Sequence, residues 1–365
     1  MRECLISKRV IKYFITLYLI VISLLAYTTP LSYSEADILF RDNSFESTIT
    51  QFIFNYTHNQ FFLRLPFILI SILTIYLYLE LLKNYFKEWS SYYNLSIFIY
   101  LITPGVLLSS ILVNYATIPI FTTLLFIYAN QKNSKLLEVL SLVLLFFTHS
   151  AYFVIYIAII IYSYRVKDLW TLSISTILLI MSLIYPTYSI GGIPKGHLLQ
   201  LIGIYAAIFS PLLFLAILFS LYKSYRYLKN DLLVIISITS FILSILLSIR
   251  QKIKITDFSV FFIFSTPLLI LTLKKSIEVR LREFHKKYYL ICKIVISVLL
   301  LETFIIIMHH PLYIIAPQVD WLIDKNIYSI PSIVKSIKST NKECKKVIPK
   351  KAKNLYKYYG IEECK

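Results

Sequence analysis

The sequence predicts an all-α polytopic membrane protein with about eleven transmembrane helices and a small extracytoplasmic α/β appendage. Three observations support this fold class. The chain of 365 residues is 58% hydrophobic and only 15% charged, and its mean hydropathy is +0.72. Apolar runs near spanning length follow one another along most of the chain. Aromatic residues make up 16% of the sequence, which is typical of helices whose ends lie in the headgroup region.

The first predicted span follows a basic stub that contains Arg2, Lys8, Arg9 and Lys12, and it extends to about Tyr27. It is long for the apolar part of a signal peptide, and no small-residue cleavage site follows it, so we expect it to remain as a span. Further apolar runs cover residues 61–82, 94–112, 116–130, 136–149, 151–164, 169–185, 198–222, 231–249, 256–273 and 288–308. The several short runs are consistent with tilted or re-entrant helices.

The distribution of basic residues predicts the orientation of these spans. With a cytoplasmic N-terminus, most Lys and Arg residues fall on the inner side, as the positive-inside rule requires. The exceptions on the outer side, before the tail, are Arg41, Arg64, Lys195, Arg250, Lys252 and Lys254. We therefore expect a protein of the cytoplasmic (inner) membrane. The net charge of +18 follows from topology on this interpretation, and no nucleic acid is expected as a partner.

Two regions are predicted. Residues 1–308 form the multi-span membrane domain, with a first outer loop at about 28–60, and residues 309–365 form a basic extracytoplasmic tail. The tail has a helix-like stretch at 330–337, a strand-like pair at 347–348 and a second helix-like stretch at 354–359. Cys344 and Cys364 both lie in this tail, where an oxidising compartment would allow them to form a disulfide.

The first outer loop contains the candidate catalytic groups Glu35 and Asp37, directly after the first span. A carboxylate at the membrane surface is partly desolvated, which raises its pKa toward the range of a general base. The alternative is structural, because acidic residues also cap the helix that follows them.

Cationic residues at the same boundary are candidates for substrate binding. Arg64 opens the second span, and Arg250, Lys252 and Lys254 form a basic group that departs from the positive-inside rule. Each could bind a phosphate or diphosphate of a membrane lipid. For Arg64 the alternatives are snorkelling to the interface and pairing with a carboxylate, and for the other three residues the alternative is a solvated turn.

His58 shares the first loop with the carboxylates and is a candidate for contacts with substrate hydroxyls. The remaining outer histidines, His149, His197, His309 and His310, have no spacing that indicates a metal site. No cofactor is predicted with certainty, and a divalent metal has no support in the sequence.

The carboxylates at the end of the first span, followed by Arg64-Leu-Pro66 at the start of an apolar helix, resemble the type C (GT-C) glycosyltransferases of the protein mannosyltransferase and aminoarabinose transferase kind. The segment from Lys254 to Pro267 is similar to the family segment that opens a late helix. The family motif Asp-Glu-Ala falls on Ser34-Glu35-Ala36, so the usual catalytic Asp is Ser34 here, and Asp37 lies close enough to replace it. A second family acid falls near Asn114, which is uncharged.

The resemblance implies transfer of a sugar, with inversion, from a polyprenyl-phosphate donor to a glycan, lipid or protein acceptor at the outer face. In that mechanism Arg64 and the basic group at 250–254 neutralise the phosphate, and Glu35 or Asp37 takes the acceptor proton. The alternatives are an O-antigen or capsule-type polysaccharide polymerase, a lipid-linked-glycan flippase and a non-catalytic membrane protein. Changes of Glu35, Asp37 and Arg64 that leave cell-surface glycans intact would exclude an enzyme.

Overall fold

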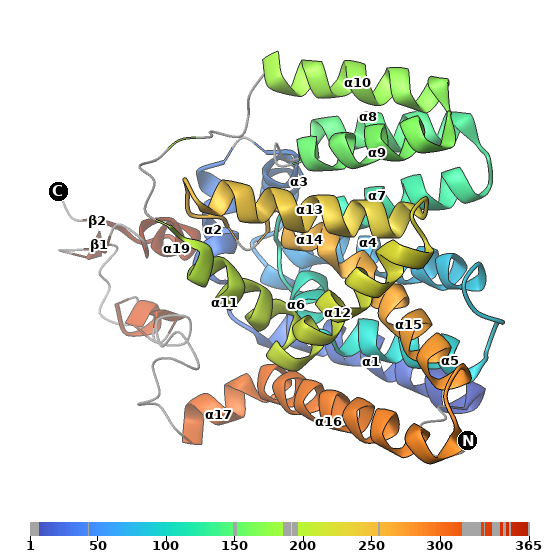
Figure 1. Cartoon of the computed structure of the whole chain (residues 1–365). Coiled ribbons are helices and arrows are strands. Elements are labelled where there is room, and N and C mark those ends of the chain that lie inside the picture. Colours follow the sequence, from blue (N-terminus) through green and yellow to red (C-terminus); the bar gives the residue numbers. More distant parts are fainter. Residues whose placement is uncertain are drawn as a thin grey trace.

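The protein is a bundle of helices with a small tail at one end, as the computed structural model shows (Figure 1). The structure describes residues 7–42, 44–148, 152–184, 191, 196–254, 256–315, 330–331, 333–337, 344–345, 348–349 and 352–363. The helices up to the middle of the chain are α1 (Lys8–Thr28), α2 (Tyr33–Phe40), α3 (Phe45–Phe54), α4 (Gln60–Lys83), α5 (Ser91–Ile102), α6 (Pro104–Ile111), α7 (Thr117–Gln131), α8 (Lys135–Phe147), α9 (Phe153–Val166) and α10 (Leu169–Ile184).

The later helices complete the bundle. They are α11 (Leu198–Phe209), α12 (Pro211–Tyr227), α13 (Leu232–Ser248), α14 (Ser259–Phe262), the 3₁₀ turn η2 (Ile263–Ser265), α15 (Thr266–Glu278), α16 (Arg282–Ile307) and α17 (His309–Ile315). In the tail, the elements are β1 (Cys344–Lys345), α19 (Lys353–Tyr358) and β2 (Glu362–Glu363).

Prolines divide two of the predicted apolar runs into bent helix pairs. The run 94–112 becomes α5 and α6, which meet at 59° in front of Pro104. The run 198–222 becomes α11 and α12, which meet at 102° at Ser210, a residue with a positive φ of 71° in front of Pro211. Proline lacks the N–H that would continue the preceding helix, but its fixed φ suits the first turn of a new one.

Among the described residues, the helices long and apolar enough to cross a membrane number four, or up to six if each bent pair is one span. The others predicted as spans, such as α9, α10 and α13, are apolar but shorter. Judged by length and composition, the described helices therefore do not account for the predicted count of about eleven spans. The chain nevertheless has the helical, apolar character of a membrane protein.

The exposed side chains of α16 support the same conclusion. Leu301 is 61% exposed and Phe304 is 59% exposed, and only 11% of the most apolar 18-residue stretch between His285 and Ile307 is buried. A helix that presents such side chains to its surroundings is suited to contact with lipid rather than water. The bundle interior is also apolar, and the buried ring of Tyr205 packs against those of Phe209, Phe214 and Phe262.

The described parts of the tail lie against the first loop. Leu355 and Tyr356 of α19 are buried in one cluster with Leu31, Ala36 and Leu63 from the N-terminal part of the chain. β1 and β2 pair in parallel over two residues each. Of the strand-like pair predicted at 347–348, Ile348 is not part of a strand, and Val347 lies outside the described residues. The helix predicted at 354–359 corresponds to α19.

Candidate functional site

Glu35 is first of all a helix cap. Ser32 precedes α2, and its Oγ accepts a hydrogen bond from the Glu35 N–H at 3.3 Å. In return Glu35 Oε2 accepts from the Ser32 N–H at 2.9 Å, so the two residues form a reciprocal capping box. Glu35 therefore caps the helix that follows it, which is the structural role named above as the alternative to catalysis.

Glu35 also forms a bidentate ion pair with Arg64. The Arg64 Nε donates to Oε1 at 2.8 Å and Nη2 donates to Oε2 at 2.7 Å. The side chains of Arg64 and Glu35 are 0% and 1% exposed. Parallel donation from a planar guanidinium to both oxygens of one carboxylate is the strongest geometry for such a pair.

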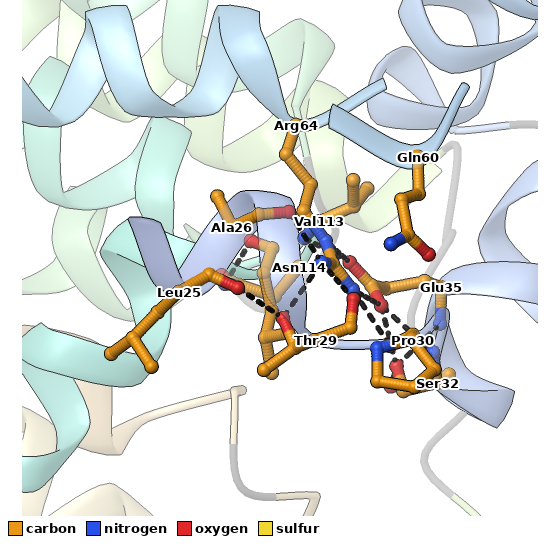
Figure 2. Close-up of polar contacts among 12 residues, drawn as sticks. Leu25, Ala26, Thr29, Pro30, Ser32, Glu35, Gln60, Arg64, Val113 and Asn114 are labelled. Carbon is orange, nitrogen blue, oxygen red and sulfur yellow. Dashed lines mark hydrogen bonds and ion pairs between the residues drawn. The ribbon is translucent and has the colours of Figure 1, made fainter. Parts of the chain in front are cut away.

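The remaining N–H groups of Arg64 bind the end of α1 (Figure 2). Nη1 donates to the carbonyl oxygens of Ala26 at 2.9 Å and Thr29 at 2.7 Å, and Nη2 donates to that of Pro30 at 3.0 Å. These carbonyls lie where the last turn of a helix has no partners within the helix. A cation at this end also complements the helix dipole. Arg64 therefore joins α1, α2 and α4.

Glu35 has one further contact, to the loop between α6 and α7. Its Oε1 accepts from the Val113 N–H at 3.0 Å. Burial alone would raise the pKa of the Glu35 carboxyl, but the charge and hydrogen bonds of Arg64, with the N–H groups of Ser32 and Val113, hold this pKa below its usual value. Such a carboxylate is a weak base, and Arg64 has no N–H group left for a phosphate. The sequence-based roles of both residues do not fit this geometry.

Asp37 and His58, in contrast, face the tail. Asp37 is half-buried, and its Oδ1 accepts from the Asn354 side chain in α19 at 2.7 Å. The carbonyl of His58 accepts from the Tyr358 hydroxyl at 2.8 Å, and its ring lies 4.5 Å from that of Phe54. The structure thus brings two of the predicted site residues to the contact between the first loop and α19.

An open cavity of about 1160 Å³ lies at this contact. Its polar and cationic lining consists of Thr28, His58, Asn59, Gln60, His310 and Lys357. Its aromatic lining consists of Tyr27, Phe54, Tyr358 and Tyr359. Asp37 and Asn354 do not line the cavity, but Asn354, which binds Asp37, is one helical turn before Lys357 and Tyr358, which do line it. The sequence-based interpretation did not single out Lys357. The available signal was its position in a helix-like stretch of the tail, which was predicted to lie on the same side as the first loop.

The basic group after α13 is separate from the Glu35–Arg64 pair. Arg250, Lys252 and Lys254 are exposed. The Lys254 N–H donates to Asp257 Oδ2 at 3.1 Å, which is a contact within the turn. Among the described residues, none of the three side chains forms an ion pair with a carboxylate. None of them lines the cavity described above.

The first loop carries two further acids, Asp42 and Glu46, which the sequence-based interpretation did not single out. Tyr115 donates its hydroxyl to Asp42, and Glu46 interacts electrostatically with the same Tyr115. Glu46 is 0% exposed, and the Ser44 side chain and its own backbone N–H offset the burial of its carboxylate only in part. Burial raises the pKa of the Glu46 carboxyl to about 7. The sequence signal was an acid in the first turn after Ser44, which resembles an ordinary helix start.

The two departures from the family motif have structural explanations. Ser34 is exposed, and its Oγ lies 3.1 Å from that of Ser32. Asn114 organises its loop, because its Nδ2 donates to the Leu112 carbonyl at 2.8 Å and its Oδ1 accepts from the Ala116 N–H at 2.8 Å. Neither side chain supplies a carboxylate at these positions.

The remaining predictions concern cysteines and histidines. Cys364 lies outside the described residues, so the predicted disulfide with Cys344 stays a prediction. His149 also lies outside them. In the described part of the chain, no group of three or more His, Cys, Asp or Glu residues is arranged to hold a metal ion. The Nδ1 of His309 lies 2.8 Å from the carbonyl oxygen of Ile306, one turn earlier in the chain.

No protein-family model, no curated protein and no solved structure matches this chain. The functional argument therefore depends on the geometry of the site.

Proposed function

We propose that the protein is a membrane glycosyltransferase that transfers a sugar, with inversion, from a polyprenyl-phosphate donor to an acceptor at the face that carries the first loop. The observation that supports this proposal is the open cavity between the first loop and α19. It combines aromatic walls, which suit sugar rings, with a Lys and two His residues, which suit a phosphate. Its volume of about 1160 Å³ is ample for a sugar phosphate.

In this mechanism Lys357 neutralises the phosphate of the leaving group. Its Nζ lies 4.7 Å from the centre of the Phe40 ring, a weak contact that a phosphate can replace. His58 and Asn59 face the same space and supply hydrogen bonds to sugar hydroxyls. Asp37, which binds Asn354 one turn before Lys357, takes the proton of the acceptor hydroxyl as that oxygen attacks the anomeric carbon. The Glu35–Arg64 pair fixes the loop that presents Asp37.

We also propose the topology expected from the sequence, with about eleven spans and a cytoplasmic N-terminus in the inner membrane. Every predicted apolar run falls on one or more helices, four to six of which reach spanning length among the described residues. Basic side chains gather at the end of the bundle that carries the N-terminus, where Lys8 and Lys12 lie over the ring of Trp89. α2, α3 and α19 lie at the other end (Figure 1), which this topology makes extracytoplasmic.

The test compares the cell-surface glycans of strains that carry single substitutions with those of a deletion strain. Lys357→Gln and Asp37→Asn are expected to reproduce the deletion pattern, because they remove the phosphate partner and the base. Lys353→Gln is the matched control, since Lys353 is exposed on the same helix and does not line the cavity. Wild-type glycans in both site variants, at normal protein abundance, would exclude the proposed mechanism.

A further inference from the structure

A basic pocket lies between α12 and α15, at the end of the bundle remote from the cavity described above. Its volume is about 330 Å³, and its lining includes Lys223, Lys275 and Arg280. The Lys223 Nζ lies 3.4 Å from the Ser276 hydroxyl, and Lys275 lies over the ring of Tyr227 at 5.7 Å. These contacts hold the cations in place without neutralising their charge.

The carboxylates near this pocket do not balance the cations. Glu278 is the acid in the lining, and its Oε1 lies 4.0 Å from the Nζ of Lys274. Among the described residues, Lys223, Lys275 and Arg280 form no ion pair with a carboxylate. Three cations around one pocket therefore favour an anionic ligand.

An apolar groove continues from the basic pocket between α12, α15 and α16. Its volume is about 390 Å³, and Thr272 and Ser276 line both spaces. The groove is walled by apolar side chains that include Leu215, Phe219 and Ile291. These three are 61%, 57% and 58% exposed, so the groove is open to the surroundings of the bundle.

The position of this double site suits the membrane interface. α15 ends at Glu278, which interacts electrostatically with Tyr92 at the start of α5. α5 follows the C-terminal end of α4, whereas the cavity near His58 lies at the N-terminal end of α4. With about 1.5 Å per residue, the 24 residues of α4 separate the two ends by about 36 Å.

We propose that this surface binds an anionic phospholipid, with the phosphate among Lys223, Lys275 and Arg280 and one acyl chain along the groove. A phosphate on an aliphatic chain is the chemistry that matches a cationic pocket joined to an apolar channel. The bound lipid packs α12 against α16 at the cytoplasmic end of the proposed topology. This site is independent of the proposed glycosyltransferase activity, because it lies at the opposite end of the bundle.

The test uses the purified full-length protein in a neutral detergent, with fluorescent phosphatidylglycerol as the probe and phosphatidylcholine and a polyprenyl phosphate as competitors. The double variant Lys223→Gln/Lys275→Gln is expected to weaken phosphatidylglycerol binding about 30-fold. The matched control is Lys132→Gln/Lys167→Gln, which removes the same charge from exposed positions at the same end of the bundle. It should change the affinity less than about twofold.

A second variant tests the groove with all charges retained. Ala216 lines the groove, and Ala216→Trp fills it, so phosphatidylglycerol binding should again weaken. An equal loss in the control double variant would overturn the proposal, because it would show a diffuse charge effect. Equal binding of phosphatidylcholine would do the same. Stronger competition by the polyprenyl phosphate than by unlabelled phosphatidylglycerol would reject a phospholipid as the occupant.

Discussion

The Arg64→Met substitution gives the sharpest test of the buried pair as a structural element. It leaves the Glu35 carboxylate buried with only the Ser32 and Val113 contacts, and it removes the donors to the end of α1. Loss of one partner of a buried ion pair costs about 3–5 kcal/mol, because the other charge remains without compensation. For 365 residues, at about 2.1 cal/mol/K per residue, this lowers the unfolding temperature by roughly 5 °C.

The assay is thermal unfolding of the purified protein in detergent. Arg41→Met is the matched control, since Arg41 is an exposed arginine of the same loop, and its unfolding temperature should stay within about 1 °C of the wild type. The double variant Glu35→Gln/Arg64→Met should lose less than the sum of the single losses, by about 2 kcal/mol, because no buried charge is left. Strictly additive losses, or an unchanged unfolding temperature in Arg64→Met, would refute the reasoning.

Two further predictions concern Glu46 and Gly105. The pKa of Glu46 is raised to about 7 from 4.5, so its contribution to stability is present below pH 4.5 and is lost as the pH rises through 7. This contribution to the free energy of unfolding amounts to about 3 kcal/mol. In Glu46→Gln, the unfolding temperature should therefore fall less between about pH 5 and 8 than in the wild type. An equal fall in both proteins would contradict the raised pKa of Glu46. A Cβ on Gly105 would lie 2.4 Å from Ile208 Cγ2, so Gly105→Ala should destabilise by about 1–3 kcal/mol. Gly203 in α11 is the control, because nothing lies within 4 Å of a Cβ added there. Gly203→Ala should leave the unfolding temperature unchanged or raise it. An equal drop in unfolding temperature for Gly105→Ala and Gly203→Ala would rule out the contact at Gly105.

The positions of the helices could be predicted from the sequence because hydropathy and proline act locally. The apolar run 61–82 corresponds to α4, and Pro211 begins a new helix where the sequence indicated one continuous run. The bend of 102° at that position required knowledge of how α11 and α12 pack against their neighbours. Helix length relative to a membrane was overestimated for the same reason, since bends and short connections shorten the straight segments.

The sequence by itself determined that the first loop carries carboxylates, that Arg64 follows them and that a basic tail ends the chain. Only the tertiary structure decided that Glu35 and Arg64 neutralise each other, that Asp37 meets Asn354 and that Lys357 lies in the same cavity as His58. The physical reason is distance along the chain. Asp37 and Asn354 are 317 positions apart, and such contacts arise from packing of the whole bundle rather than from any local pattern.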